Sequence, residues 1–117
     1  MQGDEAWLRD MLAAARDAQA HTAGMDRNAF LTDRRTQHAV QLVIVIIGEA
    51  AGKVSDEARK TLPTVPFSQI VRMRNRLVHH YFKVDPNVVW DVVEKDLNPL
   101  VDAIEAYFAT GSEGSSV

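Results

Sequence analysis

Apolar residues recur at helical spacing through the first half of the chain. A stripe of Trp7, Leu8, Met11 and Leu12 predicts a helix over about residues 5–21, followed by a connection that contains Gly24. A second helix is expected over residues 31–51. Its centre, "LVIVII", is rich in Val and Ile and resembles a buried strand, but it continues into "GEAAGK" without a turn signal. We therefore interpret it as a central helix, packed by several neighbours or by a second subunit.

The second half of the chain is divided by prolines and capping residues. Ser55 is expected to cap a short helix over residues 56–60, and Pro63 and Pro66 interrupt the chain before a helix over residues 66–82. Asp85 and Pro86 then begin a last helix. Its apolar stripe consists of Val93, Leu97, Leu100, Val101, Ile104 and Phe108. The prediction is an all-α fold, a four-helix up-and-down bundle with short extra helices.

Length and composition limit the class of protein. The 117 residues fit a single domain, expected over residues 1–110 with a disordered polar tail over 111–117. The absence of cysteine excludes disulfides and thiolate zinc sites. The first residues are acidic, unlike a secretory signal, and the apolar run 42–47 is too short to span a bilayer. These features predict a soluble cytoplasmic protein without membrane contact. With a formal charge of −3, any contact with nucleic acid must be local.

One basic stretch, "RMRNRLVHHYFKVD" at residues 72–85, stands out in this acidic chain. On a helix at 100° per residue, Met73, Leu77 and Tyr81 share the apolar side with Ile70, and Arg74 falls only about 40° from Ile70. The opposite side holds Arg72, Arg76, His79 and Lys83, flanked by Asn75 and His80. A basic stripe opposite an apolar one is commonly just the solvated face of a helix. A guanidinium on the apolar side needs a partner, and Glu49 is a candidate.

The residue types in this stretch favour phosphodiester chemistry without a metal. Adjacent histidines diverge, and the chain has no H-E-x-x-H motif, Gly-rich phosphate loop, nucleophilic triad or paired carboxylates. Arginine can hold a phosphate while an imidazole, with an ordinary pKa of about 6.5, moves protons near neutral pH. We expect no metal and no cofactor.

The motif R-x-x-x-x-H-x-Y, from Arg74 through His79 to Tyr81, resembles the signature of HEPN-domain ribonucleases of the HepT-like type. The surrounding "GEA", "MRN" and "YFKVD" agree with that family, so the resemblance spans about residues 34–100. Two positions depart from the pattern. His80 stands where a small residue is frequent, and Phe67 where a tryptophan is common.

The resemblance implies a two-fold homodimer whose motif helices meet in a shared RNA cleft. It implies a metal-independent endoribonuclease, the toxin of a type VII-like toxin–antitoxin pair with an MNT-type nucleotidyltransferase antitoxin (MntA-like). The implied catalytic residues are Arg74, His79 and Asn75, with Arg72, Arg76 and His80 as phosphate-binding residues and Tyr81 as the acceptor of AMP from the antitoxin. On one straight helix Arg74 and His79 lie about 140° apart, and a two-fold pairing would bring together one from each subunit.

Two other functions remain open at this point. The bundle is also compatible with a non-catalytic module that docks onto a nucleotidyltransferase or binds nucleotides. A DNA-binding regulator that inserts the basic helix into the major groove is disfavoured by the acidic chain and the absence of tight turns between short helices.

Overall fold

A computed structural model describes residues 3–115 of the chain, without the side chains of residue 82 and residues 111–115. It contains helices α1 (Asp4–His21), α2 (Arg27–Leu31), α3 (Arg34–Ala51), α4 (Asp56–Lys60), α5 (Phe67–His79), η1 (Tyr81–Lys83), α6 (Pro86–Asp91), η2 (Val92–Asp96) and α7 (Leu97–Ser115). No strand occurs among these residues, so the all-α prediction is confirmed. The expected disordered tail stays a prediction, because α7 is drawn to Ser115 and residues 116–117 lie outside the described range.

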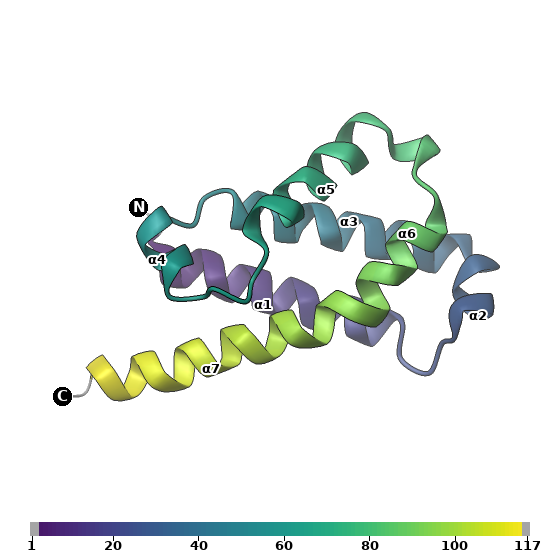
Figure 1. Cartoon of the computed structure of the whole chain (residues 1–117). Helices are drawn as coiled ribbons and strands as arrows, with labels where there is room; N and C mark the ends of the chain where they lie inside the picture. The colour runs from purple at the N-terminus through teal and green to yellow at the C-terminus, as the bar shows by residue number, and fades with distance from the viewer. Residues whose placement is uncertain (1–2, 116–117) are drawn as a thin grey trace.

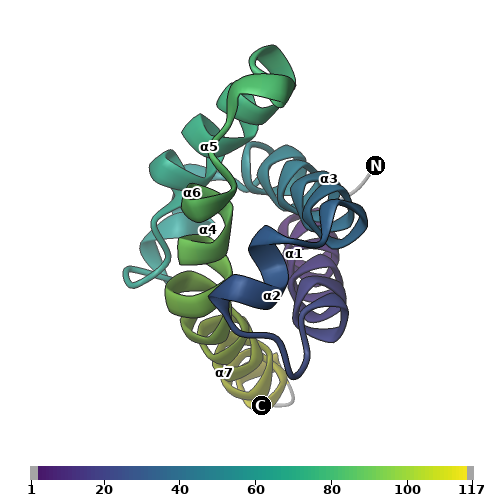
Figure 2. The ribbon, with the colours of Figure 1, turned by 90° about the vertical axis from the view of Figure 1, so that its right-hand side faces the viewer.

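The long helices alternate in direction as the predicted up-and-down bundle requires (Figure 1). Helices α1 and α3 pack side by side, α5 packs on α3, and α7 packs along α1. Seen end-on, α1 and α3 form one side of the molecule and α5, α6 and α7 the other, with α2 closing the near end (Figure 2). None of the described helices is both long and apolar enough to cross a lipid bilayer.

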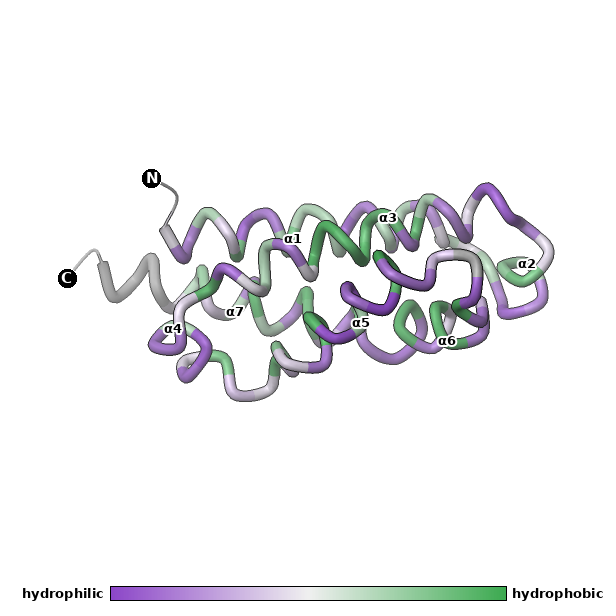
Figure 3. The backbone as a smooth tube through the Cα atoms, turned by 90° about the horizontal axis from the view of Figure 1, so that it is seen from above, coloured by the Kyte–Doolittle hydropathy of each residue, from purple (hydrophilic) through white to green (hydrophobic). Residues whose placement is uncertain are grey.

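Helix α3 is the central element, and its "LVIVII" run is helical as predicted. Figure 3 shows the apolar turns at its centre. Val43 and Ile47 face the large core cluster that α1 and α7 complete, whereas Val40 and Ile44 face a second cluster. That second cluster is built around Phe30, Leu77 and Trp90, and it joins α3 to α5 and α6. The β-branched residues are tolerated because the helix buries them on two sides.

Three helix boundaries differ from the sequence-based expectation. The helix expected over 31–51 begins at Arg34, because Asp33 caps α3 by accepting hydrogen bonds from the Thr36 backbone N–H and hydroxyl at 3.0 and 2.7 Å. The short helix α2, which precedes it, was not expected. The helix expected over 66–82 ends at His79. The last helix changes to a π-helix over Val92–Asp96, which ends three residues before Pro99, a residue without an N–H to donate into a regular α-helical ladder.

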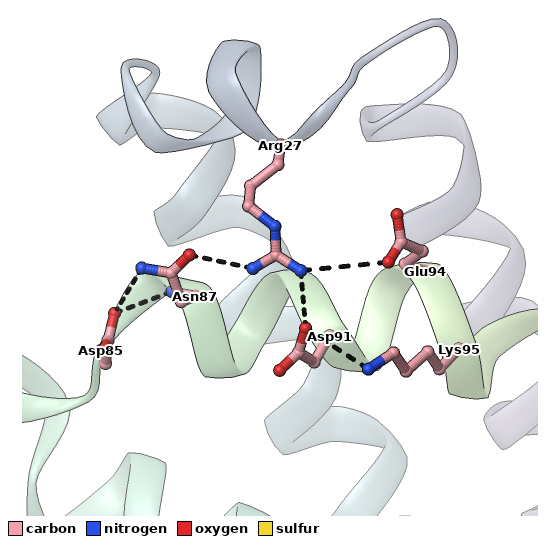
Figure 4. Close-up of polar contacts among 6 residues, drawn as sticks. All are labelled: Arg27, Asp85, Asn87, Asp91, Glu94 and Lys95. Carbon is pink, nitrogen blue, oxygen red and sulfur yellow. Dashed lines mark hydrogen bonds and ion pairs between the residues drawn. The ribbon is translucent and has the colours of Figure 1, made fainter.

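A polar cluster around Arg27 fastens α2 to α6 and η2 (Figure 4). Arg27 Nη1 donates to Asn87 Oδ1 at 2.9 Å, and Nη2 donates to Asp91 Oδ1 at 2.8 Å. Glu94 lies 3.9 Å from the same Nη2 atom. The bond from Arg27 is the main cause that holds the pKa of Asp91 below its ordinary value. The cluster fixes the end of the bundle at which α5 turns into α6.

Candidate functional site

The contact between α3 and α5 is closest at Gly48. A Cβ atom at this position would lie 2.2 Å from Arg74 Cβ and 2.7 Å from Arg74 Cγ, distances that packed atoms do not adopt. Glycine is therefore required for the stem of Arg74 to rest on the α3 backbone. This contact positions the guanidinium of the motif arginine at the edge of the α3–α5 interface.

Arg74 is held by two neighbours. Its Nε atom donates to Glu49 Oε1 at 2.9 Å, its Nη2 atom bonds the same oxygen, and its Nη1 atom donates to Asn75 Oδ1 at 2.9 Å. The predicted partnership of Arg74 with Glu49 is confirmed. The Arg74 side chain is 28% exposed, so solvent and ligands still reach it. A guanidinium fixed in this way is suited to bind a phosphate oxygen in a defined direction.

His79 is the last residue of α5 and is exposed, one and a half turns beyond Arg74. On a straight helix, five residues correspond to about 7.5 Å along the axis and a 140° rotation. Within the described part of the chain, no hydrogen bond joins the His79 side chain to Arg74 or Asn75. One protomer therefore presents the two motif residues on different sides of α5.

The three residues expected to bind phosphate, Arg72, Arg76 and His80, are all exposed. Residues 67–83 contain four Lys or Arg and no Asp or Glu, so the helix is a local positive region on an acidic protein. Arg72 and Arg76 form no ion pair with a carboxylate among the described residues. Their charge is available to a ligand.

Tyr81 lies outside α5, in the turn η1, and not on the apolar side of a continuous helix. Its ring is half-buried and packs against that of His38 on α3, with centroids 5.6 Å apart and planes inclined by 46°. Sequence reasoning missed His38 and Gly48. A glycine inside a strongly apolar helix was the available signal for Gly48, whereas nothing local marks His38.

The side of α3 next to Arg74 carries exposed apolar residues. Leu42 is 61% exposed, Ile46 44% and Val78 47%, an unusual degree of exposure for neighbouring large aliphatic side chains. Together with the partly buried Val45 they make the apolar α3–α5 face, with Glu49 and Arg74 at one end and His38 and Tyr81 at the other. No group of three or more His, Asp or Glu side chains that could hold a metal gathers anywhere in the described residues.

Comparison with known proteins agrees with the motif. The family model "Ribonuclease HepT-like" matches residues 11–107. A "Putative RNase" of Methanocaldococcus jannaschii is 33% identical over 101 residues, covering 86% of this chain and 93% of that protein. A "Probable ribonuclease HepT" of Thermococcus cleftensis is 33% identical over 99 residues, covering 85% and 90%. No solved structure gave a significant match. With its motif helix, its all-helical bundle and these relatives, the chain belongs to the HepT-like ribonuclease family.

Proposed function

We propose that the protein is a metal-independent RNA endonuclease, the toxin of a type VII-like toxin–antitoxin pair, active as a two-fold homodimer. One observation supports this above the others. Arg74 is fixed at the border of an exposed apolar face, while His79 lies exposed on another side of the same helix. A single chain thus carries both Arg74 and His79 but does not bring their side chains together in one site.

A second copy packed on the α3–α5 face completes the site in this proposal. Burial of Leu42, Ile46 and Val78 removes apolar area from water, which supplies the driving force for association. A two-fold axis near this face places Arg74 of one copy opposite His79 of the other, and does so twice. The two short basic helices then add their charges around one RNA strand.

The reaction follows from these groups. The 2′-oxygen of the ribose attacks the neighbouring phosphorus, the bond from phosphorus to the 5′-oxygen breaks, and a 2′,3′-cyclic phosphate remains. His79 takes the proton of the attacking 2′-hydroxyl, and the leaving 5′-oxygen takes a proton from water. Arg74 stabilises the charge that develops on the phosphorane oxygens, and Asn75 holds Arg74 in direction through the 2.9 Å bond. Arg72, Arg76 and His80 bind neighbouring phosphates.

Regulation in this proposal acts on Tyr81. A partner nucleotidyltransferase of the MNT type (MntA-like) transfers AMP from ATP to the phenol oxygen, forming a new oxygen–phosphorus bond and releasing pyrophosphate. The nucleotide adds an anionic phosphate two residues from His79, where it competes with RNA for the basic residues. Tyr81→Phe should keep the ribonuclease and escape modification, observed as loss of the AMP mass increment after co-expression with the transferase.

The shared site is tested by subunit complementation. Arg74→Ala and His79→Ala proteins should each be inactive in RNA cleavage, with or without EDTA, while the far-side variant Lys60→Ala keeps the activity. Co-expression of the two inactive subunits should restore about a quarter of the wild-type rate, because half the dimers are mixed and each has one intact site. If co-expression restores no cleavage, Arg74 and His79 act within one subunit. If the folded wild-type dimer cleaves no RNA, a non-catalytic docking or nucleotide-binding module is favoured instead.

A further inference from the structure

The first turns of α3 carry a motif that the proposed function leaves unused. The segment "RRTQH", from Arg34 to His38, follows the cap Asp33 and places two arginines and an imidazole within five positions. We propose that Arg34, Arg35 and the His38–Tyr81 ring pair form a subsite for a flanking nucleotide of a single-stranded RNA. The arginines bind its phosphates and the rings stack on its base. This inference rests on the proposed ribonuclease function and adds residues from α3 to it.

The ring contact between His38 and Tyr81 fixes the place of this segment. It brings α3 against the turn that follows His79, so the start of α3 lies beside the end of the motif helix. Arg34 and Arg35 precede His38 by four and three residues, which puts them on the same side of α3, one turn further out. Both are exposed. The side of α3 that faces α5 thus continues as a basic surface past Tyr81.

The charges around this subsite are predominantly positive. Arg34, Arg35 and the four basic residues of 67–83 account for six of the thirteen Lys and Arg in the chain. No ion pair engages either α3 arginine among the described residues, and the nearby acid is Asp33. Thr36 lowers the pKa of Asp33 through two hydrogen bonds, and Arg35 lowers it further through its charge. The carboxylate of Asp33 accepts two hydrogen bonds from Thr36 and forms no ion pair with Arg34 or Arg35 in the described part of the chain.

The end of the α3–α5 face at His38 and Tyr81 has a composition that suits an unpaired base. An open groove of about 610 Å³ lies between α3 and the end of α5. The second copy of the proposed dimer covers its Leu42 and Val78 portion, whereas His38 and Tyr81 line the end next to Arg34 and Arg35. Apolar and aromatic walls next to cations are the usual platform for single strands, because bases stack on the rings while the backbone follows the charges. Arg34 lies fourteen residues before Gly48, the neighbour of Arg74, which corresponds to about 21 Å along the helix. The inferred substrate is a strand of several nucleotides, unpaired where it passes the rings of His38 and Tyr81.

The test uses full-length protein in a His79→Ala background, so that RNA is bound without being cut. Binding of a labelled single-stranded RNA is measured by anisotropy over a range of KCl concentrations. The double variant Arg34→Gln/Arg35→Gln should bind more weakly by tenfold or more, and the slope of log affinity against log salt should fall by about 1.4, since each lost phosphate contact removes about 0.7. His38→Ala should weaken binding several-fold with a smaller change in slope, because stacking is mostly non-ionic. The matched control is Lys60→Gln on α4, an exposed cation far from the groove, which should change neither quantity.

Unfolding should not cause such losses. Removing cations from the first turn of a helix favours its macrodipole, so the double variant should melt no lower than the parent protein. An unchanged affinity and slope in the double variant would overturn the subsite, as would a loss of binding that accompanies a loss of the dimer in light scattering. RNA cleavage by the wild-type protein tests the proposed ribonuclease function, whereas RNA binding by the Arg34→Gln/Arg35→Gln variant tests the subsite. Failure of one proposal can therefore be distinguished from failure of the other.

Discussion

Two arginines in this protein tie one helix to another, and their surroundings differ. Arg27 on α2 reaches the amide of Asn87 and the carboxylates of Asp91 and Glu94, so both terminal nitrogens are taken by groups of α6 and η2 (Figure 4). Arg74 on α5 bonds a single carboxylate, that of Glu49, and a neighbouring amide. Both arginines are tied into hydrogen bonds, but only Arg74 borders an exposed apolar face.

The difference distinguishes an arginine in a structural cluster from Arg74, the one that we propose to be functional. The Arg27 cluster lies where α2 closes the end of the bundle, and its carboxylates offset the charge of the guanidinium. Arg74 bonds the carboxylate of Glu49, but its own segment, residues 67–83, has no acid and carries three further cations, Arg72, Arg76 and Lys83. We therefore expect a phosphate to be repelled less beside Arg74 than beside the two carboxylates around Arg27.

The largest expected effect is on catalysis. Arg74→Ala should lower kcat for RNA cleavage by about 10²–10³-fold, since a charge-stabilising donor is removed from the transition state. Arg27→Ala is the matched control and should leave kcat within a few-fold of wild type, while lowering the free energy of unfolding by about 1–2 kcal/mol. Cleavage rates and urea titrations on both variants separate the two roles. Equal losses of activity would remove the distinction.

The next effect concerns the α3–α5 face. Leu42→Glu and Ile46→Glu place a charge on exposed apolar positions, so each protein should stay folded, become monomeric in light scattering and lose cleavage together with the shared site. Ala13→Glu, on the exposed side of α1, introduces the same charge away from this face and should alter none of these properties. A Leu42→Glu dimer with full activity would contradict the proposed interface.

A smaller effect is expected from the glycine that admits Arg74. Gly48→Ala should cost about 1–2 kcal/mol net, because the clash with Arg74 outweighs the better helix propensity of alanine. Cleavage should also fall, since α5 must move. Gly52→Ala is the matched control, because its Cβ would meet neighbours only at 3.5 Å or more and its φ of −64° suits any residue. Thermal melts that rank the two variants equally would show that the close approach is unimportant.

The smallest effect is the pH dependence of the Arg27 cluster. The pKa of Asp91 is lowered in the folded chain, mainly by the hydrogen bond from Arg27, so its stabilising contribution is present above the ordinary aspartate value of 3.8 and is lost as the pH falls through the lower, folded pKa. Asp91→Asn should therefore melt below wild type near neutral pH, and the difference should shrink in acid. Asp17→Asn, an exposed aspartate on α1, should show no such trend. A difference that stays constant in acid would mean that the charge of Asp91 is irrelevant.

Much of the fold could be predicted from local signals. Ser55 caps a helix over Asp56–Lys60 as expected, since its hydroxyl accepts from the Ala58 N–H at 3.1 Å. The helical spacing of apolar residues predicted α1 and the centre of α3. The position of the charged Arg74 on the apolar side of its helix predicted an ion pair with Glu49. The end of α5 was placed wrongly at residue 82. Asp85, before Pro86, must adopt an extended backbone, and the turn η1 connects the end of α5 to it. The spacing of apolar residues contains no information on this requirement.

The sequence by itself determined the all-α class, the family and the residues of the basic motif, because periodicity, caps and short motifs are properties of neighbouring positions. Only the tertiary structure decided that Gly48 receives Arg74, that His38 meets Tyr81, and that Leu42, Ile46 and Val78 form one exposed face. These contacts join α3 to α5 and η1 across some 25 to 45 positions of the chain. Their existence depends on the angle and distance at which two helices pack, which no single segment specifies.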